Sequence, residues 1–135
     1  MDGECPFCAL ESYEIVARNR LAVAIYDKFP ASPGHILVIP RRHFADYFDA
    51  TDKELRAIDQ LLRKSRAILM QEKAPDGFNI GINVGAAAGQ TVFHLHVHLI
   101  PRYVGDHAQP AGGVRHIIPG QGYYPQITEP GLAKR

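Results

Sequence analysis

The chain has 135 residues, of which 46% are hydrophobic and 21% are charged, and this composition is typical of one water-soluble globular domain. The chain has 15 basic and 14 acidic residues. This near-neutral charge gives no reason to expect binding to nucleic acids or to acidic membranes. No apolar run approaches the roughly 18 residues of a membrane span, and no signal peptide is recognisable, so we expect a cytoplasmic protein.

The only two cysteines of the chain, Cys5 and Cys8, form a C-x-x-C motif near its start. Such a motif is either a redox pair or half of a zinc site. The redox interpretation expects a preceding strand in a βαβ unit, which the sequence lacks. A zinc site would need two further ligands from elsewhere in the chain.

Three strands are predicted next, at residues 13–18, 21–27 and 35–40. The first two are joined by a tight turn at Asn19 and Arg20, and in the second Leu21, Val23 and Ile25 fall on one face. The third is apolar on both faces, as is typical of a central strand. The loop of residues 28–34 contains Pro30, Pro33 and Gly34, and it leads into His35 at the entrance of the third strand.

One long helix is predicted over residues 51–73. Thr51 and Glu54 form a capping box, and apolar residues follow at helical spacing with charged residues between them. Pro75 and Gly77 end the pattern. We expect the apolar stripe of this helix to belong to the core.

A further strand, residues 78–84, leads into a loop of small residues at 85–91. Such a loop can bring backbone N–H groups against a phosphate, although it lacks the lysine of a Walker motif. Gln90 and Thr91 can supply hydrogen-bond donors to phosphoryl oxygens or to a bridging atom.

The last predicted strand, residues 93–101, reads F-H-L-H-V-H-L-I-P. Period-two alternation places His94, His96 and His98 on one face, which we expect to look into a cleft or onto the surface. Next-but-one residues on a strand are about 6.6 Å apart, so His94 and His98 would be about 13 Å apart at Cα. Two neighbouring histidines could share a metal, but all three on a straight strand could not.

The alternative to a metal pair is a nucleophilic histidine with two helpers. A neutral imidazole attacks phosphorus at pH 7 without a base to activate it. His96 is the natural nucleophile because it has an imidazole neighbour on each side. Its other nitrogen must then be protonated and held by an acceptor, and we expect a main-chain carbonyl in that role.

The motif H-L-H-V-H-L-I resembles the histidine triad that defines the HIT family. Gly34-His35 before I-L-V-I-P, Asn83, and the run Gly89-Gln90-Thr91 are also similar to family segments, and the resemblance covers roughly residues 5–105. It implies an α+β fold, an antiparallel sheet of about five strands with one long helix, in a HIT domain of residues 1–105. Residues 106–135 would be an irregular extension packed on the same domain, and a homodimer is implied.

The resemblance also implies roles for individual residues. A structural zinc ion would be held, as in bacterial members of the family, by Cys5, Cys8, His43 and His94. Asp27, eight positions before His35, would bind ribose, and His35 would orient the triad. The implied catalytic set is His94, His96, His98, His35, Gln90 and Thr91, and the implied nucleotide contacts are Asp27, Asn83, Gly89, Gln90, Thr91, His96 and His98.

The function that follows is hydrolysis or transfer at the α-phosphate of a purine nucleotide, through a nucleotidyl intermediate on His96. A nucleoside phosphoramidate and a dinucleoside polyphosphate are both possible substrates, and no catalytic metal is required. One alternative is a zinc-dependent hydrolase or lyase that uses His94, His96 and a third histidine such as His35. Another is a nucleotide-binding sensor with little turnover.

Overall fold

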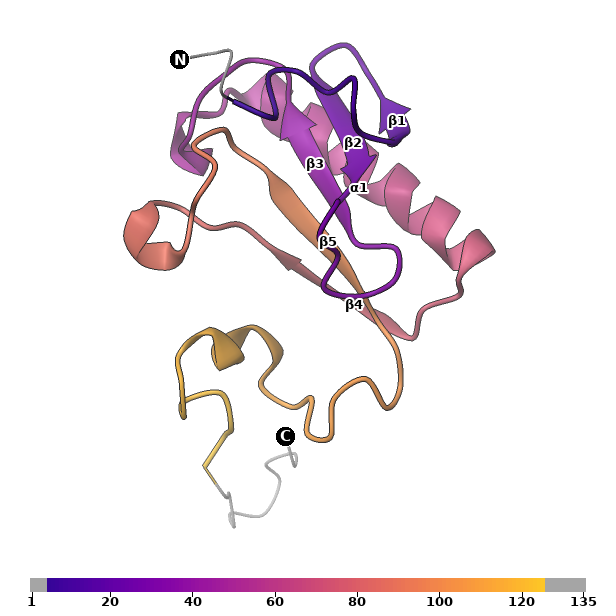
Figure 1. Cartoon of the computed structure of the whole chain (residues 1–135), viewed down its shortest axis with the longest axis vertical. Helices are drawn as coiled ribbons and strands as arrows, with labels where there is room; N and C mark the ends of the chain where they lie inside the picture. The colour runs from indigo at the N-terminus through magenta and orange to yellow at the C-terminus, as the bar shows by residue number, and fades with distance from the viewer. Residues whose placement is uncertain (1–4, 126–135) are drawn as a thin grey trace. The chain divides into compact units, whose positions relative to one another are not determined.

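A computed structural model describes residues 5–125 of the chain. Within this part the chain forms a five-stranded antiparallel sheet in the order β1-β2-β3-β5-β4, and the single α-helix packs on one face (Figure 1). The predicted fold class is therefore confirmed. The elements are β1 (Ile15–Arg18), β2 (Ala22–Tyr26), β3 (Ile36–Pro40), α1 (Asp52–Glu72), β4 (Gly77–Gly81) and β5 (Val97–Arg102), with short 3₁₀ helices η2 (Tyr47–Asp49), η3 (Ala86–Ala88) and η4 (Gly113–Ile117).

The turn between β1 and β2 forms where the sequence predicts it. The side-chain oxygen of Asn19 accepts hydrogen bonds from the backbone N–H groups of Leu21 (3.1 Å) and Ala22 (2.8 Å). The amide nitrogen of Asn19 donates to the carbonyl of Ala57 in α1 (3.0 Å). Asn19 therefore closes the hairpin and also ties it to the helix, because one side chain satisfies both backbones.

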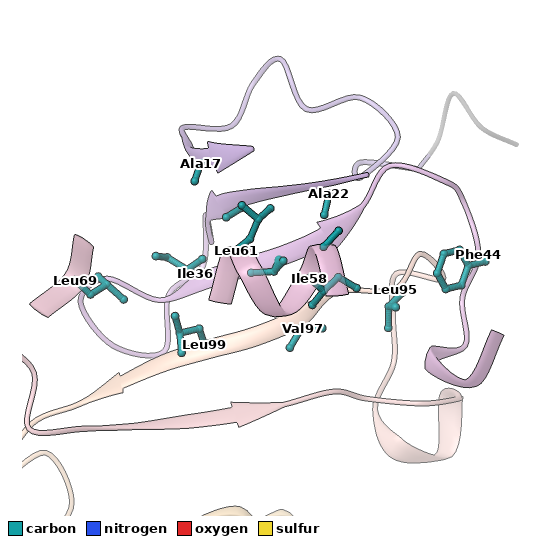
Figure 2. Close-up of a cluster of buried hydrophobic side chains, with 13 residues drawn as sticks. Ala17, Ala22, Ile36, Phe44, Ile58, Leu61, Leu69, Leu95, Val97 and Leu99 are labelled. Carbon is teal, nitrogen blue, oxygen red and sulfur yellow. The ribbon is translucent and has the colours of Figure 1, made fainter. Parts of the chain in front are cut away.

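Helix α1 begins with the predicted capping box, in which Thr51 and Glu54 satisfy each other's backbone N–H groups. Its apolar stripe packs on the sheet (Figure 2). Thirteen buried residues make up this cluster: Ala17, Ala22, Ala24, Ile36, Val38, Phe44, Ala57, Ile58, Leu61, Leu69, Leu95, Val97 and Leu99. The stripe is thus core, as expected.

The opposite face of the sheet carries a second cluster: Phe7, Val23, Ile25, Leu37 and Ile39. Its strand residues alternate with those of the first cluster, as the pleat requires. His98 of β5 lies opposite Leu37 of β3, so it shares this face. The face away from α1 is therefore the one on which the site is built.

The predicted strand of residues 93–101 is shorter than expected, because β5 begins only at Val97. Pairing between β3 and β5 reaches from Leu99 only as far as Val97. Beyond that point the carbonyl of Pro40, at the end of β3, accepts from the side chain of His94 (2.7 Å), and the prolyl nitrogen has no hydrogen to donate. The β3–β5 ladder therefore stops at Val97. The prediction that all three histidines lie on one straight strand was wrong, because His94 and His96 precede β5.

The predicted strand of residues 78–84 also ends early, at Gly81 in β4. The chain divides by compactness into residues 1–102 and residues 103–135, close to the predicted boundary at 105. In the second unit the His116 ring packs on Tyr123, with 4.6 Å between ring centroids. Packing of this extension on the first unit stays a prediction. Among the described residues, no helix combines the length and apolarity needed to cross a bilayer.

Candidate functional site

Four potential metal ligands meet beside the start of β5. The ligand atoms of Cys5, Cys8, His43 and His94 all lie within 4.8 Å of one another. The Sγ atoms of Cys5 and Cys8 are each 3.5 Å from His94 Nδ1. His43 Nδ1 is 3.2 Å from both Cys8 Sγ and His94 Nδ1. A tetrahedral zinc ion would separate sulfur from nitrogen by about 3.6 Å and two nitrogens by about 3.3 Å, so the group fits the ion.

The hydrogen bond of His94 Nε2 makes its Nδ1 suitable as a metal ligand. Its side chain is fully buried, contrary to the expectation that all three imidazoles face a cleft or the surface. Its Nε2 lies 2.7 Å from the carbonyl oxygen of Pro40, and because a carbonyl only accepts, Nε2 carries the proton. Burial lowers the pKa of His94, which favours the neutral ring. The lone pair is therefore on Nδ1, which faces the two thiols.

His96 has the opposite tautomer. Its Nδ1 lies 2.8 Å from the carbonyl oxygen of His94, so Nδ1 donates and, in the neutral ring, Nε2 carries the lone pair. The acceptor is a main-chain carbonyl, as the sequence analysis expects. Nε2 makes no hydrogen bond within the described part of the chain, and the ring is half-buried. In the neutral ring, Nε2 of His96 is thus the nitrogen that can act as a nucleophile.

His98 and His35 form a pair whose direction is fixed by the backbone. The N–H of Ala31 donates to His35 Nδ1 (2.9 Å), so the neutral His35 ring is protonated on Nε2. His35 Nε2 then donates to His98 Nδ1 (2.9 Å). The proton of neutral His98 is left on its own Nε2. Burial, followed by the neighbouring His96 and His35, lowers the pKa of His98 to about 4, so the ring is neutral at pH 7.

Asp27 ends β2 beside this pair. Its Oδ2 is 3.6 Å from His35 Nε2, and its Oδ1 accepts from the N–H of Phe29 (2.9 Å). Burial lowers the pKa of His35, and the Asp27 charge opposes that shift. Gly34 has φ +89°, and a Cβ there would meet Leu69 Cδ2 at 2.8 Å. Only glycine therefore fits at position 34, directly before His35 and the start of β3.

The glycine- and alanine-rich loop is shaped by Gln90, which is buried. Gln90 Oε1 accepts from the N–H of Gly85 (2.9 Å), and Nε2 donates to the carbonyls of Ala45 (3.0 Å) and Val92 (3.2 Å). Both amide hydrogens are engaged, so a contact between Gln90 and a phosphate would require one of these bonds to break. The more accessible members of the predicted set are Asn83, which is half-buried, and Gly89 and Thr91, which are exposed.

Sequence reasoning missed the ion pair of Arg42 and Glu54. The guanidinium of Arg42 binds the Glu54 carboxylate twice, through Nε (3.0 Å) and Nη2 (2.8 Å). These bonds hold the pKa of Glu54 down at about 2. The pair anchors the segment that carries His43 to the first turn of α1. The capping box already marked Glu54, but nothing local in the sequence marks its second partner.

Sequence reasoning also missed Phe7, between the two cysteines. Its ring is 4.9 Å from the His96 ring and 6.3 Å from the His94 ring, between centroids. The side chain is only 7% exposed. The signal available was an aromatic residue inside C-x-x-C, which by itself does not say what the ring contacts.

Comparison with known proteins agrees with this geometry. The family model of the HIT domain matches residues 11–105. An uncharacterized HIT-like protein of Mycoplasma pneumoniae is 38% identical over 106 residues, which cover 76% of this chain and 74% of that protein. The AP-4-A phosphorylase of Mycobacterium tuberculosis is 36% identical over 104 residues, covering 76% of this chain and 53% of that protein.

Among solved structures, the chain is similar to a zinc-bound histidine triad family protein of Mycobacterium smegmatis. The TM-score is 0.72 at 32% identity, over 78% of this chain and 80% of that one. The family match and these relatives lead to one conclusion, consistent with the fold and the three histidines. The chain belongs to the HIT, or histidine triad, family.

Proposed function

We propose that the protein is a nucleotide hydrolase or transferase that acts at an α-phosphate through a nucleotidyl intermediate on His96. One observation carries the proposal. The hydrogen bond from His96 Nδ1 to the carbonyl of His94 places the lone pair of the neutral ring on Nε2. A neutral imidazole in this state is a nucleophile without further activation.

The proposed first step forms a bond from His96 Nε2 to the α-phosphorus and breaks the bond from that phosphorus to the leaving group, which departs with the electron pair. His98 Nε2–H donates a hydrogen bond to the reacting phosphate or the departing oxygen, because its Nδ1 is occupied by His35. In the second step the oxygen of water, or of another hydroxyl group, attacks phosphorus and releases its proton to solvent. The P–N bond breaks and its electron pair returns to Nε2.

The pair of His35 and His98 favours a leaving group that needs no proton. If neutral His98 gave up its Nε2 proton, an imidazolate would remain, because its Nδ1 already accepts a hydrogen bond from His35. A polyphosphate leaves as a stable anion, whereas the amine of a phosphoramidate must be protonated. We therefore place dinucleoside polyphosphates ahead of phosphoramidates, and the name of the mycobacterial phosphorylase supports the same order.

The remaining contacts belong to the proposal as well. Asp27 would accept from the ribose hydroxyls of a purine nucleotide, and Asn83, Gly89 and Thr91 would contact the phosphates. Gln90 would position the loop. Zinc on the cysteine–histidine group, when bound, would hold the segments of its four ligands together without entering the reaction. A homodimer is proposed from the family resemblance, and light scattering on the purified protein tests it.

The zinc-hydrolase alternative gains no support from the geometry. The ligating nitrogen of His94 faces Cys5 and Cys8, whereas His96 turns its protonated nitrogen toward the carbonyl of His94. The two rings therefore do not present lone pairs to one shared ion. The sensor alternative is tested by turnover itself, since intact nucleotide after long incubation would favour it.

The deciding experiment uses a nucleotide labelled at the α-phosphate. We expect an acid-labile, base-stable label on the wild-type protein and none on His96→Asn, with nucleotide binding retained. A turnover panel of dinucleoside polyphosphates, phosphoramidates and sugar nucleotides identifies the substrate class. Persistence of the label in His96→Asn would exclude His96 as the nucleophile, and inversion of configuration at a chiral phosphorus would exclude the double displacement.

A further inference from the structure

Phe7 joins two parts of the site that the proposed function treats separately. It lies between Cys5 and Cys8, in a turn closed by a hydrogen bond from the N–H of Cys8 to the carbonyl of Cys5 (3.2 Å). Its ring is nevertheless buried on the sheet face that carries the triad. A residue of the potential metal-binding loop therefore belongs to the core beneath the nucleophile.

The contact between Phe7 and His96 is specific in geometry. The two rings meet edge to face, with 4.9 Å between centroids and 62° between planes. The Tyr13 ring also lies against the Phe7 ring, with 5.9 Å between centroids. Edge-to-face contacts at such distances are attractive beyond the area they bury. Phe7 is thus held in place and presents a fixed surface to the imidazole.

The orientation of the His96 ring needs such a surface. Among the described residues, the His96 ring makes one hydrogen bond, from Nδ1 to the carbonyl of His94, and this single bond leaves the ring free to tilt about it. A tilt would move Nε2, the atom that must align with phosphorus. A misplacement of about 1 Å in a reacting group costs roughly 10²-fold in rate.

We propose that Phe7 is a positioning residue through which the cysteine loop holds the nucleophilic ring of His96. A metal bound to Cys5 and Cys8 would fix the loop on both sides of Phe7, and its ligand His94 supplies the carbonyl that binds His96 Nδ1. Metal occupancy therefore sets the orientation of the nucleophile by two routes. The inference rests on the proposed role of His96, but the ring orientation can be measured without turnover.

The test compares Phe7→Leu with Phe78→Leu, the same substitution in β4, where Phe78 packs against the other core cluster. In the zinc-loaded protein we expect Phe7→Leu to broaden or shift the imidazole NMR signals of His96. The kcat of Phe7→Leu falls about two- to tenfold, as expected for the loss of one aromatic contact. Its nucleotide affinity and zinc content stay as in the wild type. Phe78→Leu leaves the His96 signals and kcat unchanged.

Metal removal provides the second measurement. Chelation shifts the His96 ring signals in the wild type, and we expect a smaller shift in Phe7→Leu, because one of the two routes is already missing. Wild-type His96 signals and kcat in Phe7→Leu would overturn the inference, as would equal changes in Phe78→Leu. Altered ring signals in Phe7→Leu together with full turnover by His96→Asn would instead refute the proposed function and leave the positioning role standing.

Discussion

Two histidine-containing clusters of this protein are similarly compact but differ in chemistry. The first contains Cys5, Cys8, His43 and His94, and the second contains Asp27, His35 and His98. In both, the potential ligand atoms lie within 4.8 Å of one another. Proximity alone would assign a metal ion to each cluster.

The two clusters differ in the backbone partner of one ring nitrogen, Nε2 of His94 in the first and Nδ1 of His35 in the second. His94 donates from Nε2 to a carbonyl, which leaves Nδ1 as a free lone pair among the thiols. His35 accepts from a backbone N–H at Nδ1, so its Nε2 must hold a proton, and that proton occupies His98. A metal on His35 Nε2 would require an imidazolate. The backbone partner therefore leaves the first cluster able to hold a metal ion, as a potential metal cage, and makes the other a proton-ordered pair.

The largest expected effect is loss of metal from the first cluster only. We expect the Cys5→Ser, Cys8→Ser double variant to contain no zinc and to unfold more easily. A ligand present at 100 times its dissociation constant stabilises the folded state by about 2.7 kcal/mol, so the loss should be at least of this order. Elemental analysis and denaturant unfolding measure the two quantities.

The matched control removes a histidine from the second cluster. His98→Ala should retain one zinc per chain, because His98 has no contact with the thiols in the described structure. Zinc retained by the double cysteine variant, or lost from His98→Ala, would contradict the assignment of cage and pair.

The next effect concerns the donor that the second cluster creates. His98→Ala removes the Nε2–H that the pair with His35 leaves on this ring, which is the proposed donor to the phosphate. Loss of one such donor costs about 10²–10³ in kcat. Steady-state kinetics on the best substrate of the panel measures it, and slow turnover should remain because His96 is intact. A kcat within threefold of wild type would mean that the ordered proton of His98 does not serve the reaction.

Much of this arrangement could be predicted from the sequence because its causes are local. The capping box at Thr51, the hairpin turn at Asn19 and the alternating face of β5 each depend on neighbouring residues. The three histidines and the C-x-x-C pointed to the chemistry, since the residue types themselves carry it. The grouping of His43 and His94 with the cysteines, and the roles of Asp27 and His35, came from the resemblance to the HIT family.

The main-chain acceptor of His96 was predicted, but the proton position on His94 could not be, because it depends on distant backbone. The carbonyl of Pro40 lies 54 positions from His94, and it both ends the β3–β5 ladder and sets the tautomer of that ring. The contact of Phe7 with His96 is equally remote in sequence. Residue types and the family resemblance therefore indicated which residues meet, and tertiary structure decided the proton positions of His94 and His98.

A smaller effect is expected at Asp27, which borders the second cluster. Asp27→Asn should keep the hydrogen bond from the Phe29 N–H but lose a charged acceptor for the ribose hydroxyls. A charge-assisted bond contributes about 1.5–3 kcal/mol, so KM for a purine nucleotide should rise about 10- to 150-fold, with kcat less affected. An unchanged KM would make Asp27 a turn residue that only neighbours His35.

The smallest effect is the pH dependence of stability. The pKa of His98 is about 4 in the folded state and about 6.5 in an unfolded chain. Between these values the unfolded state binds more protons, so the free energy of unfolding falls as pH drops from about 6.5 to 4. Because the ring is only half-buried, solvent screening reduces the size of this loss. His98→Asn should make the free energy of unfolding depend less on pH in that window, as measured by chemical unfolding at successive pH values.

Glu54→Gln is the control, since the carboxylate of Glu54 has a pKa of about 2 and contributes stability that is lost only below about pH 4.5. If His98→Asn left the decline between pH 6.5 and 4 unchanged, the neutral, proton-ordered pair would be wrong, and the second cluster would lose what distinguishes it from the metal cage.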